Sequence, residues 1–202
     1  MRNLLLFLAV NIFVFSAYSQ TSQTRASEDI RFGVKAGVNF ANFTGDDTDN
    51  LSSRTGFHFG GIVNIPISDA FSVQPEVLYS DQGAEYTMSE GYDGKFVLSY
   101  LNIPVMAQLR VAQGLNLEAG PQIGFLLCAE DQYSSSGDSG EDDIKDDVKG
   151  TDFGLNVGIN YTMESGLGIG TRYNLGLSEL PEDSEGGNWK NGVFQFYLAY
   201  FF

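Results

Sequence analysis

The sequence has few of the residues on which many functional classes depend. Its 202 residues include one cysteine, one histidine and 11 lysines and arginines. The single Cys128 excludes an internal disulfide framework and a cysteine-based zinc site. The shortage of basic residues argues against nucleic-acid binding, because phosphate contacts need clustered lysine and arginine. The single His58 has no nucleophile motif beside it, so we expect neither a catalytic site nor a cofactor.

Glycine, aromatic residues and acids are abundant instead. The chain has 24 Gly, 16 Phe and 10 Tyr, only 18% of its residues are charged, and its formal net charge is -15. This composition favours strands and turns over a helical bundle. The length is sufficient for one sizeable folded unit and too short for two typical domains.

The N-terminus has the three parts of a secretory signal. Arg2 precedes an almost wholly apolar run over residues 4–15, and Ala17-Tyr18-Ser19 supplies small residues at a cleavage site. The run is too short for a comfortable membrane span, so an uncleaved anchor is the weaker interpretation. We predict export, with the signal peptide at residues 1–19 and a short periplasmic segment at residues 20–29.

Eight later segments alternate apolar with small or polar residues, which is the period of a β-strand. Each has about the ten residues that a tilted strand needs to cross a bilayer. The segments are 31–40, 57–65, 71–80, 101–110, 115–125, 153–161, 167–177 and 194–202.

The connections distinguish a membrane barrel from a soluble sandwich, which also alternates. They are long at 42–54, 81–95, 127–152 and 179–191, and short between these. The four long connections hold 20 of the 26 acids. Strict alternation of long and short connections with an even strand count is typical of outer-membrane barrels, whose long loops face outward. We therefore predict an all-β fold, an eight-stranded antiparallel up-and-down transmembrane β-barrel, over residues 30–202 in the cell outer membrane.

The residues that alternate with the apolar ones along each strand are small or polar, and they would face the barrel interior. An eight-stranded lumen is only wide enough for side chains to fill, so its charges should pair. We expect a filled lumen rather than an open pore, with Glu76 or Glu118 as the partner of the histidine. The predicted lumen network comprises Arg31, Lys35, His58, Glu76, Arg110, Glu118 and Arg172.

The last strand ends on an aromatic residue. Its alternate apolar positions match a strand that the outer-membrane assembly machinery recognises by strand addition. The predicted assembly signal is Phe194, Phe196, Leu198, Tyr200 and Phe202. Interfacial aromatic girdles at strand ends are expected from Phe43, Tyr79, Tyr100, Tyr161 and Tyr173.

Acids gather in the first and third long connections. They offer the hard oxygen ligands that Ca²⁺ takes, although neither connection has a complete calcium-loop spacing. Solvated charge is the simpler interpretation, and residues 137–150 are expected to be flexible. The hypothesis is that divalent ions bridge the loops to lipopolysaccharide or to a protein partner. The candidate ligands are Asp46, Asp47, Asp49, Asp142, Asp143, Asp146 and Asp147.

Several runs together resemble a known family. They include FGVKAGVNFANF at 32–43, YLNIPVMAQLR at 100–110, LEAGPQIGFLL at 117–127 and the terminal aromatic strand. The chain resembles the PorT-like outer-membrane β-barrel family of Bacteroidetes over essentially its whole mature length. The resemblance implies an eight-stranded barrel and no settled activity. Prolines inside three matching strands, Pro75, Pro104 and Pro121, predict bulges or irregular pairing there.

The function that fits these observations is structural or interaction-based, through acidic extracellular loops of a lipid-embedded barrel. A soluble lipocalin-like periplasmic binder of an apolar ligand is the alternative, with its apolar parity facing a cavity. A narrow solute channel is a third possibility that the charged lumen disfavours.

Overall fold

The computed structural model describes residues 29–45, 48, 50–89, 92–135, 138–181 and 188–202. The predicted signal peptide and almost all of the periplasmic segment lie outside these residues. So do three of the proposed ion ligands, Asp46, Asp47 and Asp49.

The described chain is almost entirely β-structure. Its one helical element is a 3₁₀ turn, η2 (Lys145–Asp147), and no helix in the described part is long and apolar enough to span a membrane. The strands are β1 (Arg31–Thr44), β2 (Leu51–Ser68), β3 (Phe71–Ser89), β4 (Tyr92–Ala112), β5 (Leu115–Ser135), β6 (Asp138–Asp143), β7 (Thr151–Thr162), β8 (Leu167–Gly176) and β9 (Lys190–Phe201).

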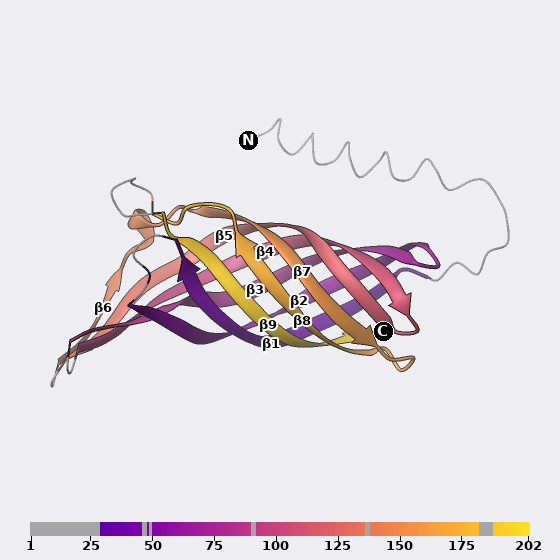
Figure 1. The fold of residues 1–202 in the computed structure, drawn as a ribbon, viewed down its shortest axis with the longest axis horizontal. Coiled ribbons are helices and arrows are strands. Elements are labelled where there is room, and N and C mark those ends of the chain that lie inside the picture. Colours follow the sequence, from indigo (N-terminus) through magenta and orange to yellow (C-terminus); the bar gives the residue numbers. More distant parts are fainter. Residues whose placement is uncertain (1–28, 46–47, 49, 90–91, 136–137, 182–187) are drawn as a thin grey trace, which may run out of the picture.

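Eight of the strands close into a ring. Neighbours pair antiparallel in the order β4-β3-β2-β1-β9-β8-β7-β5, and β4 pairs with β5 to complete the circle. The first strand, β1, pairs with the last strand, β9, and places Val34 opposite Tyr200. The predicted eight-stranded antiparallel barrel is confirmed (Figure 1). The additional strand β6 pairs with β5 outside the ring.

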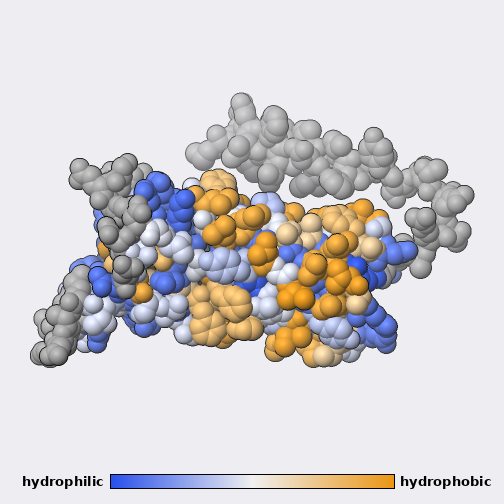
Figure 2. Space-filling model, viewed as in Figure 1, coloured by the Kyte–Doolittle hydropathy of each residue, from blue (hydrophilic) through white to orange (hydrophobic). Residues whose placement is uncertain are grey.

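The outer surface of the ring is apolar because one parity of every strand carries the large hydrophobic side chains. Phe32 on β1, Phe57 on β2 and Leu155 on β7 are 61%, 50% and 43% exposed. Figure 2 shows a broad hydrophobic zone over the middle of the visible face of the barrel, with hydrophilic residues toward both ends. We call this zone the apolar band. Such a surface is stable against lipid and unfavourable against water.

The strands differ in how far they run beyond the band. The strands β7, β8 and β9 have 12, 10 and 12 residues, whereas β3, β4 and β5 have 19, 21 and 21. About ten residues cross a bilayer, so the longer strands project well past it. We call the projecting sheet the extension: residues 51–53 of β2, 84–89 of β3, 92–97 of β4, 129–135 of β5, and β6.

The extension corrects two predictions about the long connections. Much of 81–95 and 127–152 continues the neighbouring strands, and residues 138–147, expected to be flexible, form β6 and η2. Acidic composition was read as solvation, but tyrosines in these segments, together with Phe96 and Leu98 just after the first of them, supply the apolar contacts that a sheet needs.

Pro75 and Pro104 are accompanied by irregular pairing, one of the two predicted outcomes, and not by bulges. Register is unchanged on both sides of Pro75 and Pro104, although pairs are missing from the ladder beside them. Proline removes one hydrogen-bond donor without requiring an extra residue, so the strand loses a bond and keeps its register. The register shifts lie elsewhere, for example at Ser99–Tyr100 and between Ser53 and His58.

An apolar core fills the end of the barrel that carries the extension. Its buried members include Phe43, Leu98, Tyr100 and Leu126, packed against Trp189 and other partly buried residues. Two predicted girdle residues, Phe43 and Tyr100, therefore point inward, because both stand on the lumen-facing parity of their strands. The other three, Tyr79, Tyr161 and Tyr173, are on the outward parity, as predicted.

Candidate functional site

The centre of the lumen is a buried cluster of two cations and two carboxylates. Arg172 on β8 donates two parallel hydrogen bonds to Glu76 on β3, both 2.9 Å, and a third from Nε to Glu118 on β5, 2.8 Å. Lys35 on β1 lies 3.0 Å from the Glu76 carboxylate. All four side chains are buried and their formal charges sum to zero, so the desolvation of each charge is offset by its partners.

Neutral side chains complete this cluster from the remaining wall. Tyr197 on β9 donates its hydroxyl to Glu118 at 3.0 Å, and its ring lies 3.9 Å from the Lys35 ammonium. The Tyr197 ring lies over Gly170 of the paired strand β8, where any Cβ would collide with the ring. Amides from three further residues bind the carboxylates: Gln74, Gln108 and Asn160.

His58 belongs to the neighbouring layer of the lumen rather than to the charge cluster. Its Nδ1 lies 2.7 Å from Asn39 Oδ1, which also accepts a hydrogen bond from Gln195 at 3.0 Å. The expected partners Glu76 and Glu118 are both engaged with Arg172. The histidine is 1% exposed, so it has no access to a substrate in bulk solvent.

Two predicted network residues lie at the opposite end of the barrel. Arg31 and Arg110 line a polar vestibule of about 770 Å³ at the opening that carries the short turns. Arg31 stacks on the Phe201 ring at 5.0 Å, and Arg110 is exposed. The structure therefore brings together Lys35, Glu76, Glu118 and Arg172, places His58 one layer away, and separates both peripheral arginines from them.

A second buried ion pair was missed by the sequence analysis. Arg54 on β2 and Asp81 on β3 form two hydrogen bonds of 2.9 Å, and Arg54 also donates to the Gln82 carbonyl at 2.8 Å. The pair lies between the charge cluster and the extension. Arg54 continues the parity of His58, which was a usable signal, but the predicted strand began only at residue 57.

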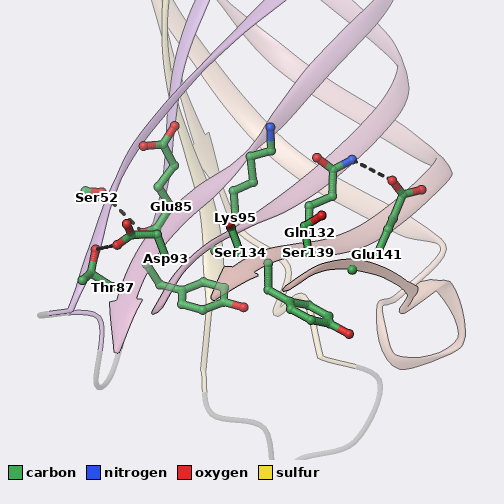
Figure 3. A pocket seen from close by; sticks show the side chains of 13 residues that line it. Ser52, Glu85, Thr87, Asp93, Lys95, Gln132, Ser134, Ser139 and Glu141 are labelled. Carbon is green, nitrogen blue, oxygen red and sulfur yellow. Dashed lines mark hydrogen bonds between the residues drawn. The ribbon is translucent and has the colours of Figure 1, made fainter. Parts of the chain in front are cut away.

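The extension carries a hollow of about 710 Å³ between its strands. Figure 3 shows side chains of one row, Glu85, Lys95, Gln132 and Glu141, which come from paired positions on β3, β4, β5 and β6. Only one of these four carries a positive charge. The row contributes acidic and hydrogen-bonding groups to the hollow, which Tyr86, Gly94, Tyr133 and Gly140 also line.

The opposite face of the same sheet is stiffened by tyrosines lying over glycines. Tyr86 pairs with Gly94, which pairs with Tyr133, which pairs with Gly140. A Cβ on either glycine would collide with the neighbouring tyrosine ring. Tyr86 also donates its hydroxyl to Asp131 at 2.8 Å. These contacts bury aromatic surface in a sheet that projects into water.

Cys128 lies just beyond the apolar band on β5. Its thiol donates a hydrogen bond to Glu130 at 3.0 Å. That bond and the negative charge of Glu130 raise the pKa of the Cys128 thiol above its usual range. The cysteine is therefore a poor nucleophile at neutral pH.

The acids proposed for divalent ions are dispersed in the described part of the chain. Asp142 pairs with Asp131 across β6 and β5, and Asp143 accepts a hydrogen bond from the Lys145 amide at 2.9 Å. Asp146 and Asp147 project from η2. No three histidine, cysteine, aspartate or glutamate side chains of the described residues form a group able to hold a metal ion.

The geometry divides the molecule into a sealed interior and an exposed surface. The charges of the central cluster and of the Arg54–Asp81 pair are paired and inaccessible, so they close the barrel and stabilise it. Charges on the extension are mostly acidic and face water, where they are available to another molecule. The exposed charges therefore lie mainly at the end of the barrel that carries the extension.

Comparison with known proteins agrees with this architecture. The outer membrane protein beta-barrel domain family matches residues 18–181. The structure is similar to that of the attachment invasion locus protein Ail of Yersinia pestis, with a TM-score of 0.54 and 17% identity over 85% of this chain and 98% of that chain. It is also similar to Neisserial surface protein A, with a TM-score of 0.52 and 14% identity over 86% of this chain and 99% of that chain. No curated protein matches the chain.

Proposed function

The chain belongs to the outer membrane protein beta-barrel domain family, and we propose that it is a non-conducting, non-enzymatic interaction protein whose extension binds a positively charged partner. The observation that carries the proposal is the contrast between a lumen closed by a paired charge cluster and a projecting sheet whose acids form no ion pair among the residues that the structure describes. Glu85, Asp93 and Glu141 line the hollow together with a single cation, Lys95.

The free edge of β6 supports a protein partner. In the described residues β6 pairs on one side with β5, and its second edge carries no strand. An open edge offers backbone donors and acceptors to an incoming strand, while its acids, Asp142 and Asp143, disfavour pairing with a second copy of this chain. A strand that carries lysine or arginine would pair with the free backbone groups of β6 and also neutralise its acids.

The charge of the expected partner differs from that of a ligand known for a structural relative. Ail has been crystallised with the heparin analogue sucrose octasulfate, a polyanion. The acidic row of the extension would repel such a ligand. We therefore expect this chain, on a similar barrel, to prefer cationic partners over anionic ones.

The soluble lipocalin-like alternative is not favoured. A lipocalin-like binder needs an apolar interior, but this lumen holds Lys35, Glu76, Glu118 and Arg172 at the level of the apolar band, and the apolar parity faces outward. The channel alternative needs a continuous wet path, which the charge cluster occupies.

Several finer assignments remain part of the proposal. These are the PorT-like relationship, cleavage after Ser19, recognition of the β9 aromatic positions by the assembly machinery, and bridging of extension acids to lipopolysaccharide by divalent ions. The β9 positions face outward and are 39–75% exposed, which supports their availability during assembly. A calcium-dependent change in loop protease sensitivity would support bridging, and its absence would remove that hypothesis.

The proposed function is tested with the mature barrel in lipid nanodiscs and a synthetic peptide that alternates lysine and valine. We expect saturable binding that weakens with added salt, and at least about fivefold weaker binding by the Glu141→Gln/Asp142→Asn variant. A peptide that alternates glutamate and valine is the matched control. Equal binding of both peptides, or an unaffected variant, would contradict the proposal, and stepwise conductance in a planar bilayer would contradict the closed lumen.

A further inference from the structure

A second cavity lies at the extracellular end, separate from the hollow on the extension. It measures about 440 Å³ and is bounded by inward-facing residues of β1 and β4 and by the segments around η2 and before β9. Its walls are largely apolar, and the principal contributors are Phe43, Phe96, Leu98, Val148, Leu180 and Trp189. The volume is in the range of small-molecule sites, roughly 300–1,000 Å³.

Aromatic rings form one wall of this cavity. Phe43 stacks on Trp189 with 5.8 Å between ring centroids, and Phe96 lies 5.9 Å from Phe43 and 6.2 Å from Trp189. Below them Leu98 and Leu180 are almost fully buried and belong to the apolar core. The rings are thus fixed by the core on one side and border the cavity on the other.

Backbone hydrogen bonds hold the covering segments in place. The Ile144 amide donates to the Ala129 carbonyl at 3.0 Å, and the Lys149 amide donates to the Leu180 carbonyl at 2.8 Å. The Leu180 amide donates to the Trp189 carbonyl at 2.8 Å. The covering segments are therefore tied to β5 and to each other, which favours a preformed cavity over one that a ligand must open.

Two carboxylates give the cavity its charge. Asp146 and Asp147 of η2 line it and are exposed. The ammonium groups of the two neighbouring lysines point to other partners, since Lys145 donates to the Leu127 carbonyl at 2.8 Å and Lys149 lies 3.9 Å from Glu179. No ion pair involves either aspartate among the residues that the structure describes. The electrostatic complement of this cavity is a cation joined to an apolar body.

We propose that this cavity binds a small organic ammonium ion that carries an aromatic or alkyl group. The apolar group occupies the space between Leu98, Val148 and Leu180, and the ammonium lies near the two aspartates and the ring faces. Aromatic faces attract such cations, most strongly when these are alkylated and weakly hydrated. The site uses none of the residues assigned to peptide binding, so it stands independently of the proposed function.

Trp189 makes the proposal directly measurable, because it is the only tryptophan of the chain and lines the cavity. Benzyltrimethylammonium is titrated into the mature barrel in nanodiscs while tryptophan emission is recorded. Benzyl alcohol and benzenesulfonate are the neutral and anionic comparisons. We expect saturable change with the cation at about tenfold lower concentration than with benzyl alcohol, and none with benzenesulfonate.

Two charge variants locate the site. Asp146→Asn/Asp147→Asn should weaken binding of benzyltrimethylammonium at least about fivefold, because both rim charges are removed. Glu141→Gln/Asp142→Asn removes the same charge from β6 and should leave that affinity within about twofold. All four side chains are exposed, so neither variant should impair folding.

The proposal is overturned if the three probes act alike, if both charge variants change the affinity equally, or if Trp189 emission does not respond. A Val148→Phe variant provides a second check, since the larger side chain fills the cavity and should abolish the response while the heat-modifiable mobility of the barrel is retained. The β6 variant reports on peptide binding and the η2 variant on the ammonium, so failure of one proposal is distinguishable from failure of the other.

Discussion

Within the apolar band the core of the barrel is mostly polar, and beyond the band the core is mostly apolar. On β1, Phe40 faces outward inside the band, whereas Phe43 faces inward past its end. On β4, Val105 faces outward and Leu98 inward. The strands are continuous, so the surroundings account for the inversion. Lipid accepts apolar side chains without penalty, whereas water drives them into the interior.

The two cores are stabilised by different interactions, and this difference can be tested by substitution. The lumen relies on charge pairs that must all be present, because an unpaired buried charge is costly. The extension relies on apolar contacts, whose loss is costly in proportion to the volume removed. The lumen should therefore be more sensitive to the loss of one charge and the extension to the loss of one methyl group.

The largest effect is expected from Arg172→Met. The substitution leaves Glu76 and Glu118 without their shared partner and should lower the free energy of unfolding by about 3–5 kcal/mol. Urea unfolding in detergent micelles, followed by heat-modifiable electrophoresis, measures the change. The double variant Arg172→Met/Glu118→Gln removes one charge of each sign and should recover part of the loss. A loss below about 0.5 kcal/mol, the scale of surface substitutions, would contradict a structural role for the cluster.

The next effect is expected from Leu98→Ala, in the apolar core that lies next to the extension. Leu98 is 1% exposed, and removing its side chain should cost about 2–4 kcal/mol. The loss should appear as faster protease cleavage within the extension, with the membrane-embedded strands still protected. Leu198→Ala, at a lipid-facing position that is 56% exposed, is the matched control and should leave cleavage of the extension unchanged. Equal sensitivity of both variants would show that the extension has no separate core.

A smaller effect is expected at the boundary between the cores, from Arg54→Met. It removes the bidentate pair with Asp81 and should cost about 1–3 kcal/mol, because the pair is buried but lies near water. Equilibrium unfolding together with protease cleavage of the extension measures how the loss is divided. Loss in both assays is expected if the pair couples the two regions, and an effect on neither assay would exclude that coupling.

The smallest effect concerns Cys128, at the start of the extension. Because Glu130 raises the pKa of the Cys128 thiol, its reaction with iodoacetamide at pH 8 should be slow. Glu130→Gln lowers that pKa, increases the thiolate fraction and should raise the rate about threefold. A full pH–rate profile is the measurement, and Glu141→Gln is the control. If Glu130→Gln did not shift the pH–rate profile, Glu130 would not be the cause of the raised pKa of the Cys128 thiol.

The barrel was predictable from the sequence because strand parity is a local property. The alternation around Phe32, Leu155 and Leu198 sufficed for an eight-stranded ring, and the opposite parity placed Lys35, Glu76, Glu118 and Arg172 in the lumen. The particular pairs were not predictable, because they join residues on strands that are distant in sequence, such as Glu76 and Arg172.

The extension was missed for a different physical reason. The sequence analysis assumed one orientation of the apolar parity, so Phe43, Leu98 and Tyr100 were not recognised as core residues when the parity inverted. In retrospect, the inversion itself marks where strands leave the membrane. The pairing of Tyr86 and Tyr133 with glycines was also hidden, because Gly94 and Gly140 resemble loop residues in an acidic context.

The inversion is tested most directly by the emission of Trp189 in nanodiscs made with brominated lipids. Trp189 packs against Phe43 and Phe96 beyond the apolar band, so its emission should be shifted to the blue, as in an apolar environment, yet remain unquenched by bromine. A tryptophan introduced by Phe40→Trp in a Trp189→Phe background should be quenched strongly. Strong bromine quenching of Trp189 would show that the extracellular core is in contact with lipid and would contradict this account.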